Sequence, residues 1–193
     1  MTVGELLDRT RSHYLTHLSR CWVDARSRSG VEVATEVVLC DAKGVAVREG
    51  AWSLPCRVDT CLRKNGEVVD SIMVGTERLI AFAPLEFEWS GGLAVRLAPF
   101  PWDYCELRLG APVFDPAHFR AWFDRWFDAE DSRPEGARGF KGVVHFMSDP
   151  AVVDGVTRLL VDFGSAPVEA FEQLLDAAVA SGQTSVRIGQ PGE

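Results

Sequence analysis

The chain has no apolar run long enough to span a bilayer. A transmembrane helix needs about 20 consecutive apolar residues, whereas the uncharged apolar runs here have only the length of β-strands. The N-terminal sequence MTVGELLDRTRSHYL also lacks the basic start, apolar middle and small-residue cleavage site of a secretory signal. We therefore predict a cytoplasmic protein with no membrane partner.

Cysteine pairs with the spacing of a metal or redox motif are also missing. The five cysteines are odd in number and contain no CxxC pair, which favours reduced thiols over a disulfide framework. Cys56 and Cys61 are close in sequence, but no second Cys/His pair stands at a matching spacing for zinc. His13 and His17 are four residues apart without an HExxH pattern around them. We expect neither a metal nor another cofactor.

Catalytic and nucleotide-binding motifs are equally scarce. Residues 162–164, Asp-Phe-Gly, have the letters of the kinase magnesium motif, but the catalytic loop, Gly-rich loop and strand lysine that accompany it are missing. The chain has no GxGxxG, GxxxxGK[ST] or GxSxG pattern. A Ser/His/Asp or a Cys/His site, such as Cys105 with His145, could be assembled only from distant residues, and no local motif supports one. The sequence therefore favours a protein that is not an enzyme.

Lysine is rare and positive charge is in the minority. Only three lysines occur among 20 basic residues, against 28 acidic residues, for a net charge of -8. Scarce lysine with plentiful Ala, Gly and Val is typical of a high-GC bacterial coding sequence. The acidic balance argues against nucleic-acid binding, which depends on basic residues. Residues 101–193 carry -7 of the net charge, so a basic protein partner and a merely solubilising acidic surface are both open.

What is plentiful is core-forming sequence. Hydrophobic residues make up 47% of 193 residues, enough for one compact domain over residues 1–193, with a subdivision into 1–112 and 113–193 as the alternative. Thr2 and Glu5 form a capping box that predicts a helix to about Cys21. From residue 31 to about 109, short β-type runs separated by turns at 41–44, 64–67 and 90–92 predict an antiparallel meander.

The strongest single prediction is a helix over residues 115–128. Asp115 suits the N-cap, Pro116 the first helical position, and Phe114 with Phe119 a hydrophobic staple. Aromatic residues then recur at helical spacing and form one stripe, which we expect the sheet to cover; they are Phe119, Trp122, Phe123, Trp126 and Phe127.

The remaining residues predict a C-terminal β-α-β unit. Apolar runs at 143–147 and 156–163 have strand length, residues 167–180 show helical spacing, and 185–188 form a final short run. A right-handed crossover would pair the last strand in parallel with the strand at 156–163. The fold class is therefore α+β: a meander, an N-terminal helix, an aromatic-striped helix on the sheet and the β-α-β unit.

One segment is a candidate contact surface. Pro99 and Pro101 favour an extended backbone that could present aromatic and acidic side chains, a combination found at binding hot spots. The candidate binding residues are Trp102, Asp103, Tyr104 and Glu106. The alternative is that these rings cap the sheet and cover the aromatic helix.

These observations favour a non-enzymatic bacterial protein that binds another protein, as a toxin-neutralising partner would. The rival hypothesis is an enzyme or small-ligand binder with a pocket of dispersed residues between sheet and helix. A homodimer through exposed aromatic surface is a third hypothesis.

Overall fold

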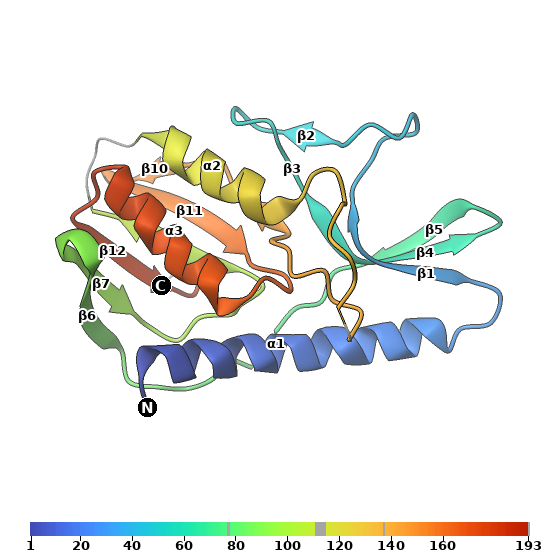
Figure 1. Cartoon of the computed structure of the whole chain (residues 1–193), viewed down its shortest axis with the longest axis horizontal. Coiled ribbons are helices and arrows are strands. Elements are labelled where there is room, and N and C mark those ends of the chain that lie inside the picture. Colours follow the sequence, from blue (N-terminus) through green and yellow to red (C-terminus); the bar gives the residue numbers. More distant parts are fainter. Residues whose placement is uncertain (77, 111–114, 137, 193) are drawn as a thin grey trace.

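The computed structural model describes residues 1–76, 78–110, 115–136 and 138–192 and confirms an α+β fold (Figure 1). Its helices are α1 (Val3–Arg26), α2 (Pro116–Phe127) and α3 (Val168–Ala180). Among the described residues, no helix combines the length and the apolarity needed to cross a membrane.

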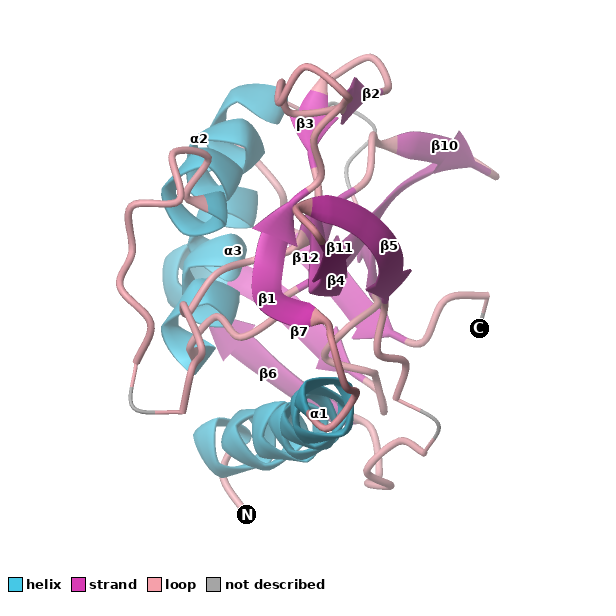
Figure 2. Ribbon diagram, turned by 90° about the vertical axis from the view of Figure 1, so that its right-hand side faces the viewer, coloured by secondary structure: helices cyan, strands magenta, loops and turns pink. Residues whose placement is uncertain are grey.

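The larger sheet has the strand order β10-β11-β8-β12-β7-β6, with the short β9 also paired to β11. Its strands are β6 (Leu85–Trp89), β7 (Leu93–Leu97), β8 (Cys105–Leu109), β9 (Phe146–Met147), β10 (Ala151–Val153), β11 (Val156–Asp162) and β12 (Ser185–Gly189). Figures 1 and 2 show α2 and α3 side by side on one face of this sheet. That face therefore carries the main core.

A smaller sheet has the order β1-β4-β5 and projects beyond the larger one (Figure 1). It consists of β1 (Glu32–Val38), β4 (Arg57–Lys64) and β5 (Glu67–Ile72), and the short strands β2 (Arg48–Glu49) and β3 (Leu54–Pro55) pair beside it. Helix α1 contacts both β1 and β4. It also reaches α3, so it lies along both parts of the molecule.

The predicted series of hairpins is divided between these two sheets. The turn at Asn65 and Gly66 joins β4 to β5, with positive φ at both residues, and the 3-10 turn η1 (Ser90–Gly92) joins β6 to β7. After the turn at 41–44, however, only an isolated Cys40–Ala46 bridge forms, and β1 pairs with β4 instead. Two of the three expected hairpins are present.

The predicted pairing of the last strand is wrong in one respect. Strand β12 does not lie beside β11; β8 separates them and is antiparallel to both. Strand β12 is instead hydrogen-bonded in parallel with β7. The C-terminal unit therefore inserts its final strand between two strands of the N-terminal half, and the two halves share one sheet.

The aromatic stripe of α2 is covered, as predicted. All five of its rings are buried. Two of its indoles donate hydrogen bonds to α3, from Trp122 to the carbonyl of Ala170 and from Trp126 to Oε1 of Gln173. The Asp115 carboxylate caps the helix by accepting from the amide of Ala117 at 3.0 Å. Phe114 of the expected staple lies outside the described residues.

Candidate functional site

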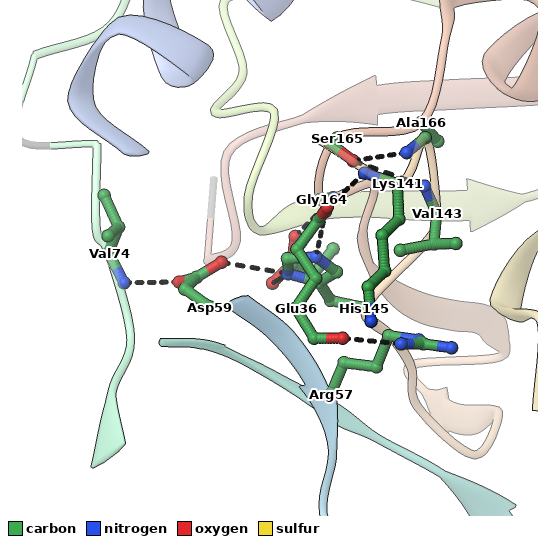
Figure 3. A network of polar contacts seen from close by, with 12 residues as sticks. Glu36, Arg57, Asp59, Val74, Lys141, Val143, His145, Gly164, Ser165 and Ala166 are labelled. Atoms are coloured by element: carbon green, nitrogen blue, oxygen red, sulfur yellow. Dashed lines mark hydrogen bonds and ion pairs between the residues drawn. The ribbon is translucent and has the colours of Figure 1, made fainter. Parts of the chain in front are cut away.

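Four titratable side chains, including that of His145, meet inside the protein. Figure 3 labels three of them, His145, Glu36 and Asp59. Nε2 of His145 lies 2.8 Å from Oε1 of Glu36, and Nδ1 lies 2.9 Å from Oδ1 of Asp59. The second contact is an ion pair without the alignment of a hydrogen bond. A third carboxyl oxygen, Oδ2 of Asp162, is 3.9 Å from Nδ1. One imidazole therefore stands among three acids.

Strand pairing places these groups together. Thr35 faces Thr60 and Val37 faces Val58 in the β1–β4 ladder, so Glu36 and Asp59 occupy the facing positions between them. The backbone of His145 joins the two sheets, because its amide donates to the carbonyl of Asp162 and its carbonyl accepts from the amide of Arg57. The cluster therefore lies at the junction of the small and large sheets.

The electrostatics of the cluster follow from burial and mutual contact. Burial by itself lowers the pKa of His145, but the contacts with Asp59 and Glu36 outweigh it and raise that pKa well above 6.5. Burial raises the pKa of Glu36, yet the bonds from His145 and from the amide of Lys141 leave it lowered overall. Asp59 has a lowered pKa for similar reasons. The centre of the cluster is thus an imidazolium between two carboxylates.

Asp162 behaves differently from the other two acids. Burial is the main cause that raises its pKa well above 3.8, and the nearby Asp59 raises it further. The amide of Gly164 donates to its Oδ1 at 2.8 Å. A protonated Asp162 is the expected state, because a third negative charge here would be buried beside two others.

Arg57 forms a second buried polar contact beside this cluster. Its guanidinium donates to the carbonyls of Phe127 and Asp128 at the end of α2 and to the carbonyl of Glu36. It also pairs with Asp131 at 2.7 Å. Helix C-termini leave carbonyls without intrahelical partners, so Arg57 satisfies that end of α2 from the small sheet.

The His145 cluster is sealed from solvent. The side chains of His145 and Glu36 are 0% exposed, that of Asp59 is 1% and that of Asp162 is 6%. A substrate cannot reach groups buried in this way without local opening. The geometry of the His145 cluster therefore suits a structural role, in which it joins the two sheets to the N-terminal helix. The Tyr14 hydroxyl of that helix donates to Asp59 at 2.6 Å.

The other chemical candidates from the sequence fall in unreactive surroundings. Cys105 is fully buried, and burial raises the pKa of its thiol, which disfavours the nucleophilic thiolate. His13 and His17 pack edge to face at 4.8 Å between ring centres. In the part of the chain that the structure describes, no group of three or more His, Cys, Asp or Glu residues could hold a metal ion.

The four candidate binding residues divide between interior and surface. Trp102 is 0% exposed and packs on Phe163, and its indole donates to the carbonyl of Gly164. Asp103 is 8% exposed and accepts from Thr76. Tyr104 is 43% exposed, beside a hollow of about 410 Å³. Trp102 is thus a packed core ring, as in the alternative interpretation of this segment, whereas Tyr104 is exposed and can contact a partner.

Glu106, the fourth candidate, lies on the sheet face opposite α2 and α3. Directly facing strand positions on this face bear arginines: Arg158 faces Arg108, Arg108 faces Arg187, and Arg187 faces Arg96. At the spacing of neighbouring strands, roughly 4.8 Å, four such residues span about 14 Å. We call Arg158, Arg108, Arg187 and Arg96 the arginine row.

Few acids balance the arginine row. Glu106 lies close to Nε of Arg108 and 3.8 Å from Arg158, so one carboxylate serves two guanidiniums. Arg96 lies 3.9 Å from Glu86 at the sheet edge. Arg187 is exposed and has no hydrogen-bond or ion-pair partner among the described residues. With two acids against four arginines, the row carries unbalanced positive charge. Like charges on directly facing positions destabilise a sheet.

The row borders a shallow hollow of about 200 Å³. Arg96, Arg108 and Arg187 line it together with Glu106, and the half-buried Ala98 lies beside them. Gln190 lines both this hollow and the one beside Tyr104. A larger hollow of about 1000 Å³ lies elsewhere, over β1, β4 and the segment around residues 39–46, with a lining rich in valine and alanine.

Sequence reasoning missed both the His145 cluster and the arginine row. The signal for the cluster is a charged or titratable residue inside an apolar run, as in Val-Val-His-Phe-Met at 143–147. The signal for the row is one arginine in each strand, flanked by inward-facing apolar residues. Neither signal shows which strands are neighbours, so neither brings the residues together.

No known protein family, curated protein or solved structure matches this chain.

Proposed function

We propose that this protein is a non-enzymatic binding module that engages another protein through its larger sheet. The contact surface is the face of that sheet opposite α2 and α3, which we call the open face. The observation that carries this proposal is the arginine row. An acidic chain gathers four arginines in facing positions, although that arrangement costs stability. A bound partner that neutralises this charge would offset that cost.

The residues around the row also suit a protein interface. Arginine and tyrosine are enriched among the residues that dominate binding energy, and Tyr104 is linked to the row through Gln190. The alternating strand β7 presents Ala94 and Arg96 outward while its other residues are buried. Because the backbone of these strands is held by the sheet, a partner that covers this face orders only side chains and not the backbone.

Affinity capture with matched baits tests this function. The native protein, an Arg96→Glu/Arg187→Glu double variant and an Arg20→Glu control are immobilised and exposed to lysate from the natural source. Arg20 is exposed on α1, away from the large sheet. Near-ultraviolet circular dichroism confirms that each bait is folded.

The proposal expects a protein that the native and Arg20→Glu baits retain and the double variant loses, with direct binding reproduced by the purified pair. Retention of the same proteins by all three baits would contradict it. So would the absence of any retained protein.

A further inference from the structure

We infer that the arginine row receives an acidic segment of the partner, with a carboxylate seated between Arg96, Arg108 and Arg187. This inference rests on the proposed function and adds the chemistry of the partner to it. The guanidinium group is a planar fork of N–H donors that can hold a carboxylate through two parallel hydrogen bonds. Three such groups on adjacent strands border one hollow.

The free hydrogen-bonding capacity of the row supports this inference. Arg187 lies in the middle of three adjacent arginines and has no partner among the described residues. Nε of Arg158 is buried without a hydrogen bond. Glu106 and Glu86 are the only acids paired with the row in the described structure. Four arginines against two acids leave an excess of about two positive charges for an incoming ligand.

The shape of the charged surface favours an acidic protein segment over a nucleic acid. The row spans only four strands and ends at β6, where Glu86 and Glu88 are exposed. A long phosphate backbone that followed the row would run onto these acids, and the chain as a whole is negative. A short acidic peptide can end before these acids, and the half-buried Ala98 at the hollow can contact the stems of its side chains.

This partner has the opposite charge from the one that overall composition suggests. The net charge predicts a basic partner, yet residues 101–193, the more acidic part, place three of their eight basic residues in the row. Local potential at a contact surface, and not net charge, sets the sign of the partner that is favoured there. A basic partner therefore becomes an outcome that the test can reveal.

Fluorescence anisotropy with a labelled glutamate-rich peptide tests the inference. The comparison probes are the same peptide with every Glu replaced by Gln, the same peptide with every Glu replaced by Lys, and a single-stranded oligonucleotide of equal negative charge. The proteins are the native chain, Arg187→Gln, Arg96→Gln and the control Arg20→Gln.

We expect binding of the Glu peptide that weakens with added salt, as contacts between exposed charges do. Arg187→Gln and Arg96→Gln should each weaken it about tenfold, the effect of losing one charged hydrogen-bonding group, and Arg20→Gln should leave it unchanged. Equal binding of the Gln or Lys peptide, equal or tighter binding of the oligonucleotide, or full affinity in both row variants would overturn the inference.

Competition separates failure of this inference from failure of the proposed function. If a protein is captured through the open face but the Glu peptide does not displace it, the acidic-segment inference is wrong while the binding function stands. If the Glu peptide binds at the row but the lysate yields no partner, the proposed function fails, although the row still binds carboxylates.

Discussion

Gly164 lies against the ring of His145 and shows how closely the buried cluster is packed. Its φ is +51°, a conformation that non-glycine residues seldom adopt. A Cβ placed there would stand 2.3 Å from Cδ2 of His145, far inside normal contact distance. The glycine that follows Asp162 and Phe163 is therefore required by the neighbouring ring, which gives this tripeptide a structural meaning unrelated to magnesium binding.

Gly164→Ala should consequently destabilise the protein by about 3 kcal/mol, because it combines backbone strain with overpacking in the core. Gly155→Ala is the matched control, since that glycine also has positive φ but an added Cβ would meet nothing within 4 Å. Urea unfolding of both variants checks the prediction. Equal losses in the two variants would mean that the His145 ring does not constrain residue 164.

The buried contacts of Arg57 lead to a separate prediction about stability. Arg57→Met keeps much of the side-chain volume but leaves the carbonyls of Phe127, Asp128 and Glu36 without their donor. We expect a loss of about 3 kcal/mol in the free energy of unfolding. Arg20→Met, at an exposed position on α1, should change it by less than about 0.5 kcal/mol. A loss in Arg57→Met no larger than that of the control would show that solvent replaces the guanidinium.

At the scale of elements, α2 was the most predictable part of the molecule. Its cap, its proline and its aromatic spacing are all local in sequence, and the helix observed at Pro116–Phe127 lies within the predicted range. Strand neighbours were less predictable, because apolar alternation indicates which face is buried but not which strand lies alongside. The position of β12 between β8 and β7 depends on contacts with residues 77 to 91 positions away along the chain and has no local signal.

The cap of α2 can be tested directly. Asp115→Ala removes the acceptor for the amide of Ala117 and should cost about 1 kcal/mol. Asp124→Ala, an exposed acid within the same helix, should cost less than about 0.5 kcal/mol. Equal costs in the two variants would exclude the cap as a source of stability.

The arginine row leads to the opposite expectation for stability. Arg187→Thr removes repulsion from Arg108 and Arg96 and introduces a residue that favours strands, so the free energy of unfolding should rise by about 0.5 kcal/mol. Arg187→Lys keeps the charge and should show no such gain. Thermal denaturation at low salt compares them, and a clear loss of stability in Arg187→Thr would count against unbalanced charge in the row.

At the scale of the whole molecule, the His145 cluster makes stability depend on pH. A raised folded pKa means that His145 stabilises fully below 6.5 and loses this contribution as pH rises through the raised value. The lowered pKa values of Glu36 and Asp59 act oppositely: their contribution is complete above their ordinary values of 4.5 and 3.8 and is lost as pH falls. Asp162 has a raised pKa, so its contribution is complete only below its ordinary value of 3.8 and is lost as pH rises above that value.

Stability should therefore be greatest at about pH 4.5 and should fall below it as Glu36 and Asp59 gain protons. It should decline through the range from 4.5 to 6.5 because of Asp162, and more steeply above 6.5 because His145 adds to the loss. Urea unfolding of the native protein across this range and above it checks the prediction. His13→Gln is the control, because the ring of His13 lies against the carbonyl of Arg78 and not against the acids of the cluster, and it should keep the same profile. A free energy of unfolding that rises steadily above pH 6.5 would contradict an imidazolium at position 145.

The candidate site was only partly predictable, because it depends on how the strands are ordered in the whole molecule. Tyr104 and Glu106 were identified from local sequence and lie at or beside the open face, whereas Trp102 is in the core. The row itself joins strands from residues 93 to 189. A surface of this kind exists only once the strands are ordered, so composition and motifs cannot reveal it.

The central claim is that the open face of the larger sheet binds an acidic segment of a protein partner. Amide chemical-shift mapping of the isotopically labelled protein, titrated with the glutamate-rich peptide, tests it most directly. The account predicts that the largest shifts fall in β7, β8 and β12 around Arg96, Arg108 and Arg187, with α2 and α3 little affected. Shifts centred on β1, β4 and β5, or no shifts at all, would contradict it.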